Sequence, residues 1–512
     1  MRASLAHDWQ SAIVPVIFTQ SRHLRLSPIP YPLSPNPYPL LAGALNCRAC
    51  RSQGFPSVAA AYLGGVSLQR IGEIFAAEQR RYVDAHPRSL QQTGRGIAGF
   101  YDGVPMHWMR DWSMPFPFVV ESARDASLRD IDGNEYADFC LGDTGSMFGH
   151  SPGPVAAAIA RQAHQGLTYM LPTADAIAIG PLLAERFGLP HWQVATTATD
   201  ANRFALRVAR AVTGRPKILV FNGCYHGTVD ETFVRLVDGR VVHRPGLLGQ
   251  ATDLTQLARV VEFNDVDGLR QELAHGDVAC VITEPVLTNS CMVLPEPGFL
   301  DQVRRRTREM GTLLLIDETH TISSGPGGYT RAHGLEPDLF VLGKPIAGGV
   351  PASVWGFTDD VARRLHDVRA QTPPGHSGMG TTLSANALAL AAMRATLEHV
   401  MTTEAYRHME RLAGLLADGL QATITARRLP WHVVRVGARV EFVCAPGPLR
   451  NGTEAEAAHA PALEQAIHLA LLNRGCLIAP FHNMMLACPA TTETQVARLQ
   501  AAFAAVADAL VS

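Results

Sequence analysis

The sequence has 512 residues, of which 47% are hydrophobic and 18% charged, and its formal net charge is −2. This length exceeds what one hydrophobic core usually serves, so we expect two or three domains. The near-neutral balance of charge argues against nucleic acid or an anionic membrane as a partner.

Residues 1–66 differ in composition from everything that follows. Residues 27–41 have proline at nearly every second position, which is incompatible with a helix and favours an extended, disordered tail. The chain start lacks the basic-then-apolar pattern of a signal peptide, and no uncharged apolar run approaches the ~18 residues that span a bilayer. Nine scattered cysteines favour a reducing compartment, so we expect a cytoplasmic protein. Cys47 and Cys50 form an isolated pair, and we expect no metal site there.

The two ends of the folded part have the pattern of one small α+β domain. Its N-terminal part, residues 67–150, is expected to hold a helix at 71–84 and short strands. The Asp132-Gly133-Asn134 sequence indicates a hairpin turn between two of them. The C-terminal part, residues 396–512, begins with a long helical stretch. The other elements expected are strands at 118–120, 127–136, 137–139 and 433–443, and helices at 462–473 and 494–510.

Between these parts, in residues 151–395, apolar runs alternate with helical stretches. The strands expected here are 217–221, 278–283, 313–317, 338–342 and 353–357, with helices at 200–212 and 299–310. Several of these strands are continuous apolar runs, which is typical of strands buried on both faces. The sequence therefore predicts an α/β domain with a mostly parallel sheet covered by helices.

Side chains able to do chemistry follow the ends of these strands, where open α/β sheets bind their ligands. Lys344 and Asp317 each end a strand, and Tyr225-His226 follows another. Thr197 to Thr199 precede a helix. Taken singly, each has an ordinary structural explanation, such as a surface lysine or a helix cap. Together they match the needs of pyridoxal 5′-phosphate (PLP): an amine for the Schiff base, a carboxylate for the ring nitrogen, an aromatic ring, and a helix start for the phosphate.

From about residue 70 onward the chain resembles the fold-type I, class-III aminotransferases, on the branch of glutamate-1-semialdehyde aminomutase and the β-amino-acid transaminases. The motifs that carry this resemblance are Ile131-Asp-Gly-Asn-Glu-Tyr, Gly149-His150, Thr197-Ala-Thr-Asp-Ala-Asn202, Thr213-Gly-Arg-Pro-Lys-Ile, Tyr225-His226-Gly227, Glu284-Pro285-Val286, Ile316-Asp317-Glu318, Leu342-Gly343-Lys344, Gly348-Gly349 and Thr381-Thr382-Leu-Ser-Ala-Asn386. Their order along the chain is that of the family.

The resemblance implies a role for each matching residue. Lys344 would form the Schiff base, and Asp317 would pair with the pyridine nitrogen. The other implied cofactor contacts are Thr197, Ala198 and Thr199 at the phosphate, Tyr225 and Thr319 on the two ring faces, His226 beside Tyr225, and Glu284 near the site. Thr382 would reach the phosphate of a neighbouring subunit, which implies a homodimer with its active sites at the interface.

Some positions depart from the family pattern. Ala198 replaces a glycine, so the phosphate loop must avoid a positive φ or tolerate strain. Thr319 replaces a valine and brings a hydroxyl that needs a partner. Ala385 replaces another glycine, and Pro345 follows the lysine. These departures indicate a divergent subgroup with its own substrate.

Two reactions fit these motifs. The first hypothesis is an aminotransferase that moves an amino group between an amine or amino acid and a carbonyl acceptor. The alternative is an isomerase, an aminomutase or racemase, which the 284–289 stretch favours. A protein that binds PLP without catalysis would have lost Lys344 or Asp317, and both are present. For the substrate we expect contacts from Trp108, Arg110 as a carboxylate fork, and His482, although each has an equally good structural explanation.

Overall fold

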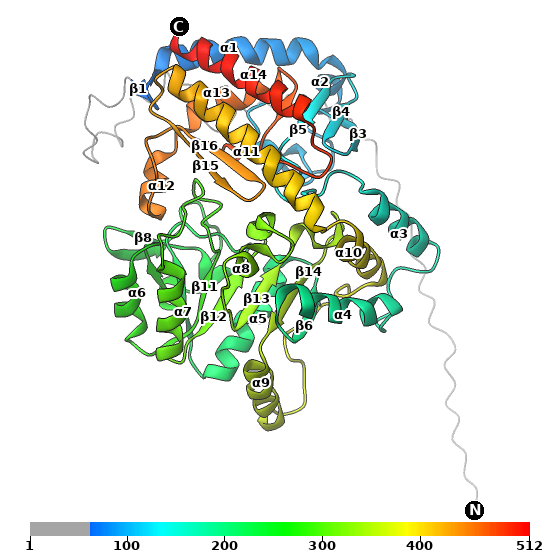
Figure 1. The fold of residues 1–512 in the computed structure, drawn as a ribbon, viewed down its shortest axis with the longest axis vertical. Helices are drawn as coiled ribbons and strands as arrows, with labels where there is room; N and C mark the ends of the chain where they lie inside the picture. Colours follow the sequence, from blue (N-terminus) through cyan, green and yellow to red (C-terminus); the bar gives the residue numbers. More distant parts are fainter. Residues whose placement is uncertain (1–61) are drawn as a thin grey trace, which may run out of the picture. The chain divides into compact units, whose positions relative to one another are not determined.

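The structure, a computed structural model, describes residues 62–512 (Figure 1). The proline-rich stretch, Cys47 and Cys50 lie outside these residues. The seven cysteines in the described part of the chain are buried and unpaired. Each helix found between residues 62 and 512 is too short or too polar to cross a membrane.

Seven strands form the large sheet, in the order β10-β7-β11-β12-β13-β14-β6. They are β6 (His191–Ala195), β7 (Lys217–Phe221), β10 (Ala258–Val261), β11 (Val278–Thr283), β12 (Leu313–Asp317), β13 (Leu339–Leu342) and β14 (Ser353–Phe357). Of these seven, β14 alone runs in the direction opposite to the other six. The predicted mostly parallel sheet is therefore confirmed. The sequence did not reveal β6 and β10, because both are edge strands with polar residues among the apolar ones.

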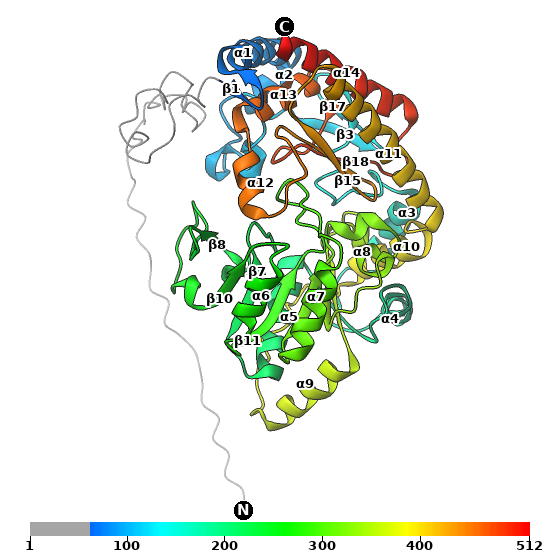
Figure 2. The ribbon, with the colours of Figure 1, turned by 60° about the vertical axis from the view of Figure 1, so that its left-hand side comes forward.

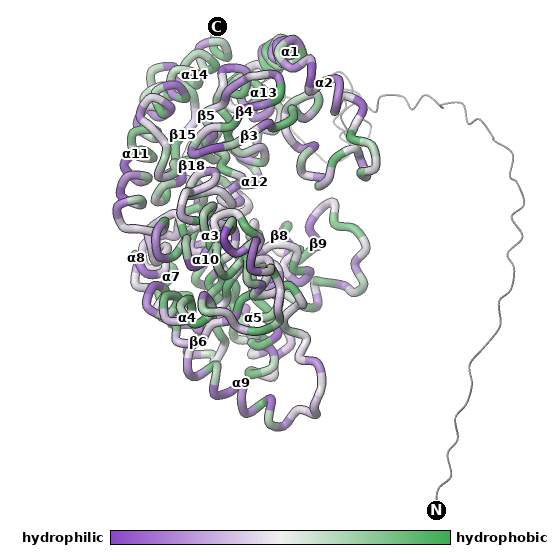
Figure 3. The backbone as a smooth tube through the Cα atoms, turned by 90° about the vertical axis from the view of Figure 1, so that its right-hand side faces the viewer, coloured by the Kyte–Doolittle hydropathy of each residue, from purple (hydrophilic) through white to green (hydrophobic). Residues whose placement is uncertain are grey.

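Helices cover both faces of this sheet. Ile218 and Val220 pack with α5 (Ala198–Thr213), whereas Leu219 and Phe221 pack with α6 (Val266–Leu273) and α7 (Phe299–Glu309). Because successive side chains of a strand point to opposite faces, a strand covered on both sides must be apolar throughout. Figure 3 shows the resulting contrast between green, hydrophobic strands and purple, hydrophilic stretches on outer helices.

The small domain joins the two ends of the described chain. One sheet has the order β17-β5-β4-β3, in which β17 (Cys476–Leu477) runs parallel to β5 (Glu135–Asp138). β4 (Ser127–Asp130) and β5 form the hairpin predicted around Gly133, and β3 (Val120–Arg124) lies at the edge. The helices α1 (Leu68–Ala85) and α14 (Glu493–Val511), from opposite ends, lie side by side (Figures 1 and 2).

The single strand predicted at 433–443 is wrong. The chain forms two antiparallel strands there, β15 (His432–Val436) and β16 (Arg439–Val443). Gly437, at φ +57°, and Ala438 make the turn between them. The Gly-Ala pair lacks the Asn-Gly or Asp-Gly signal of a tight turn. The sequence therefore gave no reason to divide this stretch into two strands.

The other strands and helices of the described residues are as follows. The strands are β1 (Tyr62–Leu63), β2 (Val66–Ser67), β8 (Val234–Val237), β9 (Arg240–His243) and β18 (Met484–Leu486). The helices are α2 (Pro87–Thr93), α3 (Gly153–Ala163), α4 (Ala174–Phe187), α8 (Gly328–Ala332), α9 (Asp359–Gln371), α10 (Ala387–His399), α11 (Thr403–Ala426), α12 (Gly452–Ala458) and α13 (Pro461–Leu472). The carboxyl ends of β7, β11, β12 and β13 meet at one edge of the large sheet, beside the start of α5.

Candidate active site

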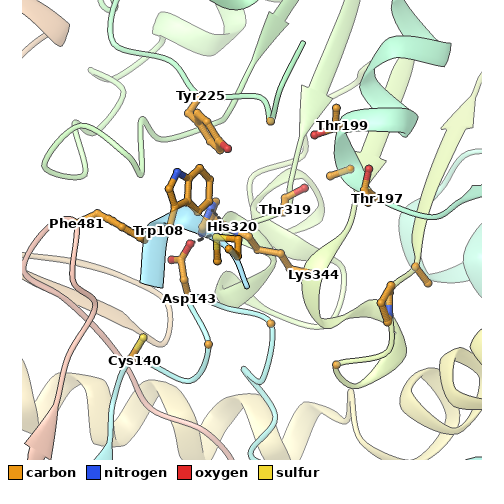
Figure 4. Close-up of a pocket in the computed structure, with 18 of the residues that line it drawn as sticks. Trp108, Cys140, Asp143, Thr197, Thr199, Tyr225, Thr319, His320, Lys344 and Phe481 are labelled. Atoms are coloured by element: carbon orange, nitrogen blue, oxygen red, sulfur yellow. Dashed lines mark hydrogen bonds and ion pairs between the residues drawn. The ribbon is translucent and has the colours of Figure 1, made fainter. Parts of the chain in front are cut away.

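A cavity of about 630 Å³ opens at this carboxyl edge (Figure 4). Nine of the predicted site residues line it: Trp108, Thr197, Ala198, Thr199, Tyr225, Glu284, Asp317, Thr319 and Lys344. Its wall also includes Trp112 and Phe481, together with Asp143 and His320, two residues that the sequence had not indicated. The fold thus brings together side chains that are hundreds of residues apart in the sequence.

The amino end of α5 faces the cavity. Thr197 caps the helix, because its Oγ1 accepts a hydrogen bond from the Asp200 amide at 3.1 Å. Ala198 and Thr199 are the first two helical residues, and N–H groups at such positions have no partner within a helix. Ala198 has ordinary helical backbone and no positive φ, so the strain considered for its replacement of glycine does not arise.

Two glycines allow other loops to approach this helix start closely. A Cβ atom on Gly343 would lie 2.8 Å from the Cβ of Ala198, and one on Gly227 would overlap the side chain of Thr199. Only glycine fits such contacts between a backbone and a side chain. The close packing carries Lys344, the next residue after Gly343, to the cavity wall.

Asp317 lies at the end of β12 and faces the cavity. Its Oδ2 accepts a hydrogen bond from Asn202 at 2.8 Å and lies 3.0 Å from Nδ1 of His226. Burial would raise the pKa of Asp317, but the His226 contact and the Thr319 amide, 3.1 Å from Oδ1, hold the pKa below its ordinary value. The carboxylate is therefore ionised. His226 is buried behind Asp317 and does not line the cavity.

Two further buried groups of the predicted set have defined partners. Thr319 Oγ1 accepts a hydrogen bond from the Gly343 amide at 3.3 Å, which satisfies the hydroxyl that replaces valine. Glu284 accepts a hydrogen bond from the hydroxyl of Thr288. Burial raises the pKa of Glu284 to about 7, so this carboxyl holds a proton more firmly than an exposed one.

The amine of Lys344 lies between two side chains that the sequence analysis missed. Nζ is 2.9 Å from Oδ2 of Asp143 and 2.7 Å from Nε2 of His320. His320 stands three residues beyond Asp317, so a search extended slightly past the strand end could have found it. Asp143 has no such signal, because it reaches Lys344 only through the folding of the small domain onto the sheet.

A left-handed turn presents Asp143 to the cavity. Leu141, Gly142, Asp143 and Thr144 all have positive φ, between 47° and 79°. A non-glycine residue in this conformation costs roughly 1–2 kcal/mol, and such strain is concentrated at functional sites. The structure therefore holds Asp143 in place against a local backbone cost.

Aromatic side chains form the outer wall of the cavity. The ring of Trp108 lies 6.2 Å from the ring of Tyr225 and 5.5 Å from that of Phe481, measured between centroids. Met106, Trp112 and Val350 extend this apolar surface. The polar groups are thus gathered at the inner end of the cavity, around Lys344 and Asp317.

The profile of the class-III aminotransferases matches residues 108–510. The chain belongs to this family. A glutamate-1-semialdehyde 2,1-aminomutase of Anaeromyxobacter sp. is 32% identical over 393 residues, which cover 75% of this chain and 89% of that protein. These matches confirm the family suggested by the motifs.

Solved structures of class-III relatives share the fold. A glutamate-1-semialdehyde-aminomutase from Pseudomonas aeruginosa PAO1 has a TM-score of 0.85 and 50% identity, and the match covers 87% of this chain and all of that one. A variant of the same protein was solved in complex with PMP. A β-phenylalanine aminotransferase from Variovorax paradoxus has a TM-score of 0.75 and 26% identity over 85% of this chain and 97% of that one. The predicted fold type I is therefore confirmed.

The residues of this class-III site fit PLP, which is the cofactor of the chain. The free N–H groups at the start of α5 and the adjacent threonine hydroxyls suit a phosphate dianion. The ionised Asp317 suits a protonated ring nitrogen. Lys344 supplies the amine, and Tyr225 supplies a ring at the cavity wall.

Besides His226, three predicted residues do not line the cavity within this chain. Arg110 lies 3.3 Å from Asp102 in an ion pair. His482 is buried, with Nδ1 3.4 Å from Oε1 of Glu441, while its neighbour Phe481 faces the cavity. Thr382 lies on the exposed segment before α10.

Proposed function

We propose that the protein is a PLP-dependent aminomutase, which moves an amino group between neighbouring carbons of one small molecule. The observation that carries this proposal is the 50% identity to a solved protein described as a glutamate-1-semialdehyde-aminomutase. The match covers 87% of this chain and all of that one. Transfer to a separate acceptor was the first hypothesis drawn from the sequence. The comparisons support the alternative better, because the curated relatives at 32% identity carry the aminomutase name as well.

Each inner residue of the cavity has a part in this reaction. PLP, when bound, withdraws electrons from the substrate and makes its neighbouring C–H bonds acidic. Lys344 would bind the cofactor and would carry the proton from one carbon to the other. Asp317 would keep the ring nitrogen protonated, and Thr197 with the start of α5 would hold the phosphate.

Transfer to a separate carbonyl acceptor is the second candidate, and the cavity wall favours it. Among the described residues that line the cavity, Lys344 is the sole lysine or arginine. Trp108, Trp112 and Phe481 suit an aromatic substituent better than the carboxylate of glutamate-1-semialdehyde. An aromatic amine donor, like that named for the β-phenylalanine aminotransferase, fits this wall.

We also propose a homodimer with its sites at the interface. Exposed apolar side chains gather just before α4: Leu167, Tyr169, Met170, Leu171 and, within the helix, Ile177. The Ala387 amide donates to the Leu167 carbonyl at 2.9 Å, which ties this surface to the segment of Thr382. A second copy docked here would cover the apolar surface and could receive Thr382 at its own phosphate site.

One assay separates the two reactions. Purified holoprotein is given glutamate-1-semialdehyde without acceptor, and in parallel β-phenylalanine with pyruvate or 2-oxoglutarate. The aminomutase proposal expects a product with the amine on carbon 1 and a ketone on carbon 2 in the first arm. New amino acid in the second arm alone would overturn it in favour of transfer. Lys344→Ala should abolish turnover in whichever arm is active.

A further inference from the structure

Asn202 is the one polar side chain among the buried residues of α5, a helix that the structure describes in full. Its neighbours on the buried face are apolar, among them Ala201, Phe204 and Ala205. Asparagine disfavours the interior of a helix, because its side chain competes for backbone hydrogen bonds. An apolar side chain would therefore suit both the helix and the core better, and the reason for Asn202 must lie in its contacts outside α5.

The amide of Asn202 makes two such contacts. Its Nδ2 donates to Oδ2 of Asp317 at 2.8 Å and to the main-chain carbonyl of His226 at 3.2 Å. A carboxylate and a carbonyl oxygen both accept hydrogen bonds, so the amide nitrogen must be the atom that faces them. The other atom of the amide, Oδ1, is buried without a hydrogen-bond partner among the described residues. An unsatisfied buried acceptor costs free energy, and the fold accepts this cost at Asn202.

The contacts of Asp317 leave one acceptor position open. An ionised carboxylate has about four lone-pair positions, two on each oxygen. On Oδ2, one is taken by Nδ2 of Asn202 and the other by Nδ1 of His226, at 3.0 Å. On Oδ1, one is taken by the amide of Thr319, at 3.1 Å. The open position is therefore on Oδ1, in a side chain that lines the cavity.

We propose that Asn202 is a positioning residue: together with His226 it holds Oδ2 of Asp317, so that Oδ1 is the oxygen that meets the ring nitrogen of PLP. Asn202 does not line the cavity and acts through Asp317. It lies one turn after Ala198, about 6 Å along the helix axis. One helix thus holds the phosphate at its start and Asp317 one turn later. The proposal rests on the role proposed for Asp317, whichever reaction follows.

The proposal can be tested by removing the ring nitrogen from the ligand. An analogue of PLP with C–H in place of that nitrogen, here called the deaza analogue, keeps the phosphate, the aldehyde and the ring hydroxyl. Trp108 and Trp112 line the cavity, so quenching of tryptophan fluorescence reports the binding of either ligand to the full-length apoprotein. The ratio of the two dissociation constants then isolates the contribution of the ring nitrogen.

In the wild type we expect PLP to bind at least about tenfold more tightly than the deaza analogue, because a hydrogen bond between charged groups is made only with PLP. Asn202→Leu, which is similar in size and has no donor, should weaken PLP about tenfold by releasing the Asp317 carboxylate. The same variant should leave the affinity for the deaza analogue unchanged. Thr197→Val should instead weaken both ligands by the same factor, because it acts on the phosphate that they share.

Asn473 provides a matched control in the small domain, just after α13. Its Nδ2 donates at 2.8 Å to the main-chain carbonyl of Glu78 and at 2.8 Å to the carboxylate of the same residue. Its Oδ1, like that of Asn202, is buried without a partner among the described residues. Asn473→Leu removes the same set of contacts away from the cavity and should leave both dissociation constants as in the wild type.

Asn202→Leu would overturn the proposal if it weakened both ligands equally or neither of them. Equal affinities of the wild type for the two ligands would overturn it together with the role of Asp317. If Asn202→Leu loses its helical circular dichroism, Asn202→Ala, which favours the helix and adds no bulk, decides the point by the same ratio. Binding is measured without substrate or turnover, so failure here is separate from failure of the aminomutase assay.

Discussion

At the scale of single residues, burial and local contacts give two carboxyl groups of one cavity opposite properties. Asp317 and Glu284 are both buried. His226 and the Thr319 amide keep the pKa of Asp317 low, whereas one oxygen of Glu284 has no hydrogen-bond partner and its pKa is raised to about 7. The sequence predicted both residues for the site but not this difference, because the partners come from separate elements.

The raised pKa of Glu284 has a stability consequence that can be measured. An unfolded glutamate has a pKa near about 4.3, so the folded apoprotein binds this proton more tightly. The cost of ionising Glu284 is absent below pH ~4.3, grows as the pH rises toward 7, and is complete above 7. Glu284→Gln should therefore raise the free energy of unfolding by up to about 3 kcal/mol at pH 8 and by little at pH 4.5. Urea unfolding of the apoprotein at both pH values measures this.

The exposed Glu185 provides the matched control, since Glu185→Gln should change stability equally at the two pH values. The same difference at pH 4.5 and pH 8 in Glu284→Gln would show that the carboxyl ionises normally.

At the scale of elements, the strands that shape the site were predictable and the loops that complete it were not. The five strands expected in the large sheet form as predicted to within a residue, since each is a buried apolar run. The sequence indicated α5 at 200–212, and the structure extends it to Ala198–Thr213. Asp143 was missed because no local pattern predicts a turn with four positive φ values in succession.

The start of α5 should have two separable roles, which one pair of variants distinguishes. Thr197→Val removes the cap and the hydroxyl, so it should lower apoprotein stability by about 1 kcal/mol. It should also weaken PLP binding about tenfold, because a hydrogen bond to a charged group is lost. Thr402→Val removes the equivalent cap of α11, whose Oγ1 accepts from Ala405 at 3.1 Å. It should lower stability similarly and leave the dissociation constant of PLP, measured by absorbance titration, as in the wild type.

At the scale of the whole molecule, the described chain leaves an apolar surface uncovered near the segment of Thr382. Met170 and Leu171 are 78% and 72% exposed, which is unusual for large apolar side chains gathered in one place. The motif at 381–386 carried the expectation of a dimer. The position of the dimer surface could not be predicted from the sequence, because the apolar residues around Met170 and Leu171 follow no helical or strand period.

Charge on this surface should separate the subunits. Met170→Asp should convert a dimer into monomers, seen by sedimentation velocity, and should lower PLP affinity because Thr382 of the neighbouring copy is withdrawn. Val511→Asp, at an exposed apolar residue of α14, should leave the assembly intact. A wild-type protein that sediments as a monomer would contradict the dimer directly.

The scarcity of lysine affects the molecule beyond its active site. All but two of the 44 basic residues Lys and Arg are arginine. A guanidinium keeps its proton beyond pH 12, whereas an amine releases it near about 10.4. The positive charge of this protein is therefore almost constant through the alkaline range in which lysine-rich proteins become strongly anionic. Its ion pairs should survive there, so that alkaline inactivation reports the chemistry of the site before it reports loss of the fold.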